Sequence, residues 1–228
     1  MNLLFLVEGE KTEKLVYSAW LPLLFPGLSK ADREEDLQGN HFFIISSNGF
    51  PFAKNLILDT LNSIQKYAVD CLFICIDAEK DDVIQRRREM EEVLQSHLPL
   101  VTTLPNYAIV IQNRTMETWF LGNRALVQSA QREEELLKCL DFYNVEVEDP
   151  ELLPIQSGHR NHAKYHLHYL RQIFLGNNLR YQKNNPREVM EESYLCQLIQ
   201  RVQDTTHLPE FKHFLQQCQQ LGAIIPCS

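Results

Sequence analysis

The chain has no hydrophobic run long enough to cross a membrane. None of its apolar stretches approaches the roughly 20 residues that a bilayer-spanning helix needs, and the stretch from Leu3 to Val7 is followed at once by Glu8. No basic leader precedes this stretch and no small-residue cleavage site follows it, so no signal peptide is predicted. We therefore expect a cytoplasmic protein without a membrane partner.

The six cysteines include no CxxC pair and no Cys/His spacing typical of a zinc site. Cys71 and Cys75 lie in an apolar run, where a free thiol behaves as a small hydrophobic side chain. Disulfides are rare in cytosolic proteins. We therefore expect buried or incidental thiols rather than bridges.

Acidic residues are missing from one long window, Leu152 to Arg187, although the chain as a whole has a formal net charge of -8. That net charge argues against indiscriminate coating of nucleic acid. The window nevertheless carries six cations: Arg160, Lys164, Arg171, Arg180, Lys183 and Arg187. We predict that Arg160, Lys164, Arg171 and Lys183, together with Lys11 near the start of the chain, contact phosphate groups.

Aromatic residues alternate with these cations, namely Tyr165, Tyr169, Phe174 and Tyr181. Aromatic faces can stack on bases, which favours a nucleic-acid surface. The alternative is an ordinary solvated helix whose tyrosines are half-buried in the core. Lys164 and Arg171 are seven apart and project from one side of the expected helix, with Leu167 and Leu170 on its packed side.

The same window holds His162 and His166, whose spacing of four occurs in helical zinc sites. No glutamate accompanies them in the His-Glu-x-x-His arrangement. A zinc enzyme that uses this cluster is therefore the weakest of the functional hypotheses.

The pattern of apolar runs predicts an α/β protein. Four buried strands are expected at 2–7, 42–45, 71–76 and 107–111, with a surface loop over 27–40. Helices are expected from residue 10 to about 21, over 52–67 and 81–97, and from about 115. Strands that alternate with helices of this length form a parallel sheet.

The second half is expected to be mainly helical, over 161–175, 187–203 and 208–220. A chain of 228 residues suffices for one core domain with a smaller appendage. We predict a Rossmann-like metal-binding domain over 1–150 and a basic helical extension over 151–228 packed on it.

Acidic residues follow the predicted strands at the points where these end. Glu8 closes the first strand, Asp77 closes the third with Glu79 two residues on, and Glu117 follows the fourth. The carboxyl ends of parallel strands share one edge, where ligands bind. Carboxylate oxygens suit Mg²⁺, and Asp-x-Glu in extended chain aims both carboxylates the same way.

The alternative is that these acids only start helices, where they favour the helix dipole. Glu10 and Glu13 fit that role better than a ligand role, although Glu13 could join a second metal ion.

Three segments resemble the Toprim (topoisomerase–primase) superfamily. They are Val7-Glu8-Gly9-Glu10-Lys11-Thr12-Glu13, Ile76-Asp77-Ala78-Glu79 and Met116-Glu117-Thr118-Trp119-Phe120-Leu121. The sequence of these segments is most similar to the RloB-type and OLD-type (overcoming lysogenization defect) branch found in phage-defence islands. The tail with Lys164 and Tyr181-x-Lys183 resembles small Toprim-like proteins. One difference is that Glu79 stands where the family usually has aspartate.

The resemblance implies a Toprim-like fold and a nuclease that cleaves phosphodiester bonds with Mg²⁺ or Mn²⁺. Glu8, Asp77 and Glu79 would be the catalytic and metal-binding residues, and Glu117 a further ligand or, preferably, a tether beside packed Trp119 and Phe120. Nucleic acid would be the substrate, in phage defence or DNA repair, with a possible partner ATPase. The alternative is a non-catalytic module on the same scaffold that binds nucleic acid, a nucleotide or the partner ATPase.

Overall fold

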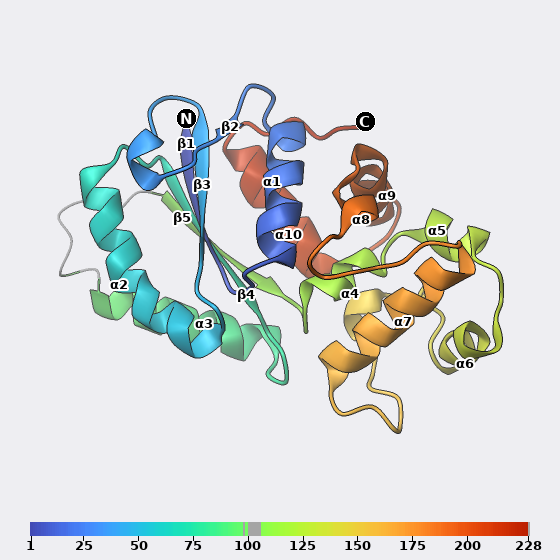
Figure 1. Cartoon of the computed structure of the whole chain (residues 1–228). Helices are drawn as coiled ribbons and strands as arrows, with labels where there is room; N and C mark the ends of the chain where they lie inside the picture. The colour runs from blue at the N-terminus through green and yellow to red at the C-terminus, as the bar shows by residue number, and fades with distance from the viewer. Residues whose placement is uncertain (98, 100–105, 228) are drawn as a thin grey trace.

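A five-stranded sheet forms the centre of the molecule in the computed structural model, which describes residues 1–97, 99 and 106–227 and all their side chains except those of 50–52 (Figure 1). All neighbouring strands are parallel. Across the sheet the strands lie in the order β2 (Ser29–Lys30), β3 (His41–Ser46), β1 (Asn2–Val7), β4 (Cys71–Asp77) and β5 (Asn106–Gln112). The α/β class predicted from the sequence is thereby confirmed.

The central strands are covered on both faces, which explains their continuous apolar sequence. Every residue of β1 is buried, and β4 is buried from Cys71 to Ile76. Runs of this kind are typical of strands inside a parallel sheet. The short β2 was expected to be loop; its two residues are exposed and polar, so no hydrophobic pattern marks it.

Two layers of helices cover the sheet (Figure 1). On one face lie α2 (Phe50–Lys66) and α3 (Val83–His97), and on the other lie α1 (Thr12–Leu24) and α10 (Pro209–Gln220). Side chains alternate between the faces: Leu4 and Leu6 join the apolar cluster under α2 and α3, whereas Leu3, Phe5 and Val7 join the cluster under α1 and α10. The period of two along β1 therefore fixes which helices each residue meets.

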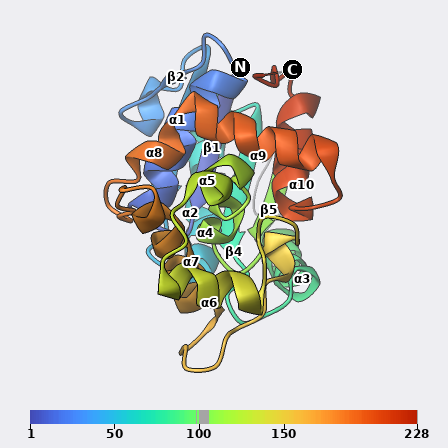
Figure 2. The same cartoon turned by 90° about the vertical axis from the view of Figure 1, so that its right-hand side faces the viewer.

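The remaining helices lie beyond α1 and α10 and beyond the end of the sheet (Figures 1 and 2). They are α4 (Met116–Phe120), α5 (Arg124–Ser129), α6 (Glu134–Phe142), α7 (His162–Gly176), α8 (Arg187–Met190) and α9 (Glu192–Asp204), with the 3₁₀ helix η3 (Pro150–Leu152). The 3₁₀ helix η1 (Glu34–Asp36) lies elsewhere, between β2 and β3 in the chain. The single helix expected over 187–203 is two helices, because the backbone at Glu191 is extended. None of the helices described is long and apolar enough to span a bilayer.

The predicted boundary at residue 150 runs through a shared core. One cluster of buried residues contains Trp20 and Trp119 together with Tyr169 and Phe211. The Trp20 indole donates to the Val189 carbonyl at 2.9 Å. Residues on either side of the boundary are therefore packed into one another rather than joined by a linker.

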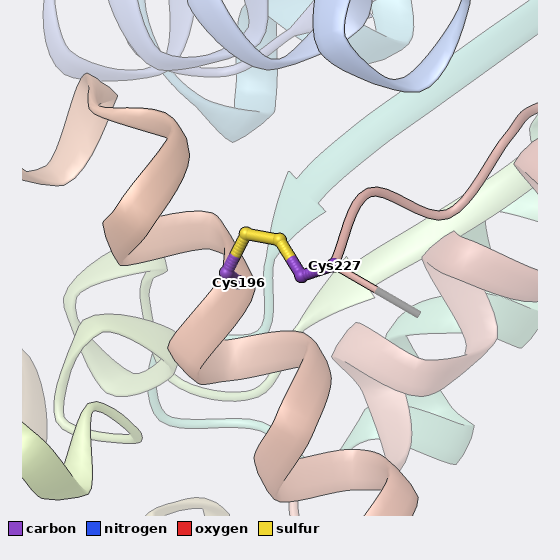
Figure 3. The surroundings of a disulfide bond; sticks show 2 residues. All are labelled: Cys196 and Cys227. Atoms are coloured by element: carbon purple, nitrogen blue, oxygen red, sulfur yellow. A yellow bond between two sulfur atoms is a disulfide. The ribbon is translucent and has the colours of Figure 1, made fainter.

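Four of the cysteines are buried free thiols, as expected: Cys71, Cys75, Cys139 and Cys218. The other two depart from the prediction, because Cys196 on α9 forms a disulfide with Cys227 in the C-terminal tail (Figure 3). Their Cα atoms lie 5.7 Å apart, across 31 residues of sequence. The expectation was wrong here because nothing in the cysteine spacing shows that the tail lies beside α9.

The chain reverses its direction across the sheet at β1. From β1 it passes through α1 to β3 on one side, and then through α2 to β4 on the other side. The loops after β1 and β3 consequently leave toward opposite faces, since α1 and α2 cover different faces (Figure 1). Such a switch point opens a crevice at the carboxyl ends of the strands, where ligands bind in open α/β sheets.

Candidate metal and phosphate site

A pocket of about 400 Å³ lies at this switch point. Five carboxylates and two lysines are among its lining residues, which are Glu8, Gly9, Glu10, Lys11, Thr12, Glu13, Asn48, Gly49, Asp77, Met116, Glu117 and Lys183. They come from the loops after β1 and β3, the first turn of α1, the end of β4, the start of α4 and the segment between α7 and α8. The pocket is therefore built by both halves of the chain.

Glu8 and Asp77 stand side by side because β1 and β4 are neighbours in the sheet. Their proximity follows from the strand pairing. Val7 is opposite Cys75, so β1 and β4 end at nearly the same level of the sheet. The Glu8 carboxylate accepts the backbone N–H of Asp77 at 3.1 Å. This bond holds the Glu8 side chain over the end of β4.

Glu13, in the first turn of α1, turns into the pocket and is only 5% exposed. Its carboxylate accepts the backbone N–H of Gly9. When the side-chain amide of Gln112 is oriented with its nitrogen toward the carboxylates, this nitrogen donates to Glu13 Oε1 at 3.1 Å and to Asp77 Oδ1. The amide oxygen of Gln112 then accepts from the Tyr17 hydroxyl at 3.0 Å. Gln112 is thus a buried bridge between two acids.

Glu117 lines the pocket from the short helix α4 and is 2% exposed. Its Oε1 accepts the hydroxyl of Tyr181 at 3.0 Å and pairs with the Lys183 ammonium at 2.9 Å. The Thr12 hydroxyl donates to the backbone carbonyl of Lys183 at 2.7 Å. These three contacts hold the segment 181–183 against Thr12 and Glu117 of the pocket.

Burial and mutual repulsion disfavour the charged forms of two carboxylates in the pocket. Burial, followed by the negative charges of Glu8 and Glu117, raises the pKa of Glu13 to about 8. Burial, followed by the charges of Glu13, Glu8 and Glu117, raises the pKa of Asp77 well above its usual value, and the Lys183 ammonium opposes this shift. Buried like charges with one partial counter-charge favour the uptake of a cation.

Glu79 does not join the pocket, although Asp-x-Glu was expected to aim both carboxylates alike. That expectation assumes extended chain, but β4 ends at Asp77 and Glu79 adopts a left-handed conformation with φ 52°. Its N–H donates to the Arg114 carbonyl at 3.0 Å. The Glu79 side chain is exposed and is not among the pocket-lining residues.

The predicted phosphate-binding cations separate into two groups. Lys11 and Lys183 line the pocket. Arg160, Lys164 and Arg171 are exposed and lie outside the pocket lining. Lys164 and Arg171 occupy the outer face of α7, and Leu167 and Leu170 are buried, as the helical spacing predicts.

The aromatic residues of this segment belong to the core. Tyr165, Tyr169, Phe174 and Tyr181 are all at most 3% exposed. The prediction that these rings stack on bases is therefore wrong, because all four pack inside the protein. The more ordinary alternative, tyrosines of a solvated helix that pack inward, is the one that the structure supports.

The zinc hypothesis fails at His166. Its Nδ1 lies 2.7 Å from the Thr118 hydroxyl and its Nε2 lies 3.2 Å from the Leu153 carbonyl, so both ring nitrogens are engaged. Burial lowers the pKa of His166 to about 3, which keeps the ring neutral. It is a structural hydrogen-bonding residue of the core.

Sequence reasoning underrated Glu13 and missed Gln112 and Tyr181. The position of Glu13 five residues after Glu8, across the β1–α1 turn, was the available signal for Glu13. Gln112 ends β5 opposite Asp77, so the pairing register identifies it. Nothing in the local sequence marks Tyr181 as a partner of Glu117, because the contact spans 64 residues.

The donor set of the pocket fits a hard divalent cation, since Glu8, Glu13, Asp77 and Glu117 offer carboxylate oxygens and no sulfur. Among the described residues, no three of these carboxylates place ligand atoms within 4.8 Å of one another. They would have to move closer to share one ion, as expected for like charges that repel. No family model, curated protein or solved structure matches the chain in comparisons with known proteins.

Proposed function

We propose that this protein is a metal-dependent enzyme that cleaves phosphodiester bonds in nucleic acid, acting in the cytoplasm. The observation that carries the proposal is the convergence of five carboxylates and two lysines in one pocket at the switch point of the sheet. Carboxylates supply ligands for Mg²⁺ or Mn²⁺, and lysines contact the phosphate that such ions bind.

Within this proposal the residues have distinct tasks. Glu8, Glu13 and Asp77 would hold the ion, and Gln112 fixes the carboxylates of Glu13 and Asp77 relative to each other. Lys183 and Lys11 would orient a phosphate oxygen toward the carboxylates. When bound, the metal would polarise the phosphoryl oxygen and lower the pKa of the attacking water.

Cleavage of plasmid DNA and of RNA in the presence of Mg²⁺ or Mn²⁺ tests the proposal. We expect Glu8→Ala and Asp77→Ala to abolish cleavage, since each removes a carboxylate from the pocket. Asp59→Asn, a substitution at an exposed position of α2, is the matched control and should retain full activity. Equal activity in all four proteins would refute the catalytic assignment.

Glu79→Gln separates the structure from the family resemblance. The resemblance implies a catalytic role for Glu79, whereas its exposed, left-handed position predicts that the variant cleaves at the wild-type rate. Loss of activity comparable to that of Asp77→Ala would show that the loop after β4 rearranges when substrate binds.

A second candidate function is a non-catalytic module that binds nucleic acid, a nucleotide or a partner ATPase. It is favoured by the Lys183–Glu117 ion pair, which already supplies a cation to the pocket. Calorimetry that detects no binding of Mg²⁺ or Mn²⁺ at millimolar concentration would favour this function over catalysis. Roles in phage defence or DNA repair remain proposals that rest on the Toprim resemblance alone.

A further inference from the structure

Cys196, Cys227 and Glu192 form a compact group on the surface, away from the pocket. The sulfur atoms of the two cysteines and a carboxylate oxygen of Glu192 all lie within 4.8 Å of one another. Glu192 and Cys196 are one turn apart on α9, so they project from the same side of the helix. Cys227 approaches from the C-terminal tail (Figure 3).

The position of Cys227 does not depend on the disulfide alone. The backbone N–H of Ile224 donates to the carbonyl of Leu24 at 2.8 Å, at the end of α1. Ala223 and Ile225 also pack against the large apolar cluster. The tail is therefore held beside α9 by contacts that survive when the sulfur–sulfur bond is broken.

Glu192 is the member of the group that the disulfide does not explain. Within the described part of the chain its carboxylate has no hydrogen-bond or ion-pair partner, and the side chain is exposed. A carboxylate placed beside two sulfurs adds nothing to a disulfide, but it completes a set of three ligands for a borderline-soft cation such as Zn²⁺.

We propose that Glu192, Cys196 and Cys227 are a zinc-binding site that is available only when the disulfide is reduced. In tetrahedral zinc sites the ligand atoms lie about 2.0–2.3 Å from the ion, and hence within about 4 Å of one another. Once reduced, the two sulfurs would move apart to a similar separation, because atoms that are no longer bonded cannot stay at bonding distance. Because the group is open to solvent, water would supply the fourth ligand.

The redox step balances with a dithiol reductant. The dithiol transfers two electrons and two protons to the Cys196–Cys227 bond, which yields two protein thiols and an oxidised, disulfide-bonded reductant. Zinc binding then displaces both thiol protons, since the thiolate is the ligand. The disulfide in the structure represents the oxidised form, in which neither sulfur is a free thiolate.

Titration of the chain with Zn²⁺ against a chromophoric chelator tests the inference, with the protein either oxidised or reduced anaerobically by a phosphine that does not bind zinc. We expect one equivalent of tight binding to the reduced protein and none to the oxidised protein. Titration with Cd²⁺ should add thiolate-to-metal charge-transfer absorption in the ultraviolet, which reports directly on the sulfur ligands.

Variants assign the ligands. Cys196→Ser and Cys227→Ser should abolish tight binding, and Glu192→Gln should weaken it by at least about tenfold, because even changes outside the ligand shell commonly have that effect. Glu191→Gln is the matched control, since Glu191 is an exposed neighbour. Circular dichroism confirms folding of each variant.

Equal binding to the oxidised and reduced wild type, or undiminished binding by Cys196→Ser, would overturn the inference. Equal weakening by Glu191→Gln and Glu192→Gln would remove Glu192 from the site. None of these outcomes depends on nuclease activity, because the group shares no residue with the pocket.

Discussion

At the scale of single residues, the carboxylates of the pocket oppose the stability of the protein. Burial of Glu13 and Asp77 near Glu8 and Glu117 raises the pKa of both residues, which means that their charged forms are disfavoured in the folded chain. Residues that bind ligands are commonly retained at some cost in stability. The cost here disappears when an opposite charge enters the pocket.

We therefore expect Asp77→Asn and Glu13→Gln to stabilise the protein in the presence of a chelator at pH 8, by about 0.5–2 kcal/mol. Addition of Mg²⁺ should stabilise the wild type but not these variants, because ligand binding to the native state raises the free energy of unfolding. Urea denaturation with and without Mg²⁺ measures both effects. Asp59→Asn should behave like the wild type; stabilisation of this control as well would point to a general charge effect.

Under the proposed function, Lys183 should weaken the binding of the metal ion and strengthen the binding of nucleic acid. Its ammonium pairs with Glu117 and opposes the raised pKa of Asp77. Lys183→Met should therefore strengthen Mg²⁺ binding several-fold and weaken the binding of a short oligonucleotide. Calorimetry and fluorescence anisotropy measure the two affinities.

Lys164→Met is the control for Lys183, because Lys164 is exposed and lies outside the pocket lining. It should leave the affinity for Mg²⁺ unchanged. A parallel change of both affinities in Lys183→Met would contradict the assignment of Lys183 to the phosphate side of the pocket.

At the scale of elements, α10 depends on a residue from a different part of the chain. The residue that precedes it, Leu208, provides no side-chain cap. The backbone N–H groups of Glu210 and Phe211 instead donate to the carboxylate of Glu151 at 3.2 and 3.3 Å. Burial raises the pKa of Glu151 to about 8. The first turn of α10 is thus capped from η3.

The raised pKa gives a pH dependence of known sign. The folded state holds a proton on Glu151 that the unfolded state, with a pKa near 4.5, releases, so the stability that this proton confers is lost as the pH rises from about 4.5 to about 8. Glu151→Gln should remove this part of the decline. Urea denaturation at pH 5 and pH 8 measures the difference, and a decline as steep as in the wild type would contradict the prediction.

Glu151→Ala removes both acceptors and should destabilise the protein by about 1–3 kcal/mol, since two buried donors lose their partners. Glu151→Gln keeps an amide oxygen and should lose less. The same denaturation curves at pH 5 separate these two effects, because the carboxyl group is then protonated.

Sequence patterns predicted the elements whose burial is continuous or periodic. β1, β4 and β5 were located within a residue or two, because residues covered on both faces leave an unbroken apolar run. The break at Glu191 and the turn at Glu79 were not predicted. At each position the chain changes direction through the backbone conformation of a glutamate, and no proline or glycine stands there as a signal. Glu8 and Asp77 were identifiable as strand ends, whereas Tyr181 and Gln112 required the three-dimensional arrangement.

At the scale of the whole molecule, Arg201 connects segments that are remote in sequence. Its side chain is 1% exposed and donates to the carbonyls of Gly122, Val145 and Glu148 at 3.2, 2.7 and 2.6 Å. These carbonyls lie in the loops that follow α4 and α6. Arg201 therefore joins α9 to the part of the chain that continues from the sheet.

Arg201→Met should destabilise the protein by about 3 kcal/mol or more, because several buried carbonyls lose a charged donor. Since both halves share one core, unfolding should remain a single transition. Fluorescence of the two tryptophans, Trp20 and Trp119, both fully buried, and far-ultraviolet circular dichroism should give the same midpoint. Two separate midpoints in the wild type would show that the halves unfold independently.

Both ends of the described chain lie near the end of the sheet at which β1 begins (Figures 1 and 2). β1 begins at Asn2 and reaches the pocket only at Glu8, about 20 Å further along the strand, while the tail passes Leu24 at the far end of α1. A fluorophore, an affinity handle or a surface linker fused at either end would consequently point away from the carboxylates. Immobilised or single-molecule assays can thus be built on this chain with the pocket left accessible to the solution.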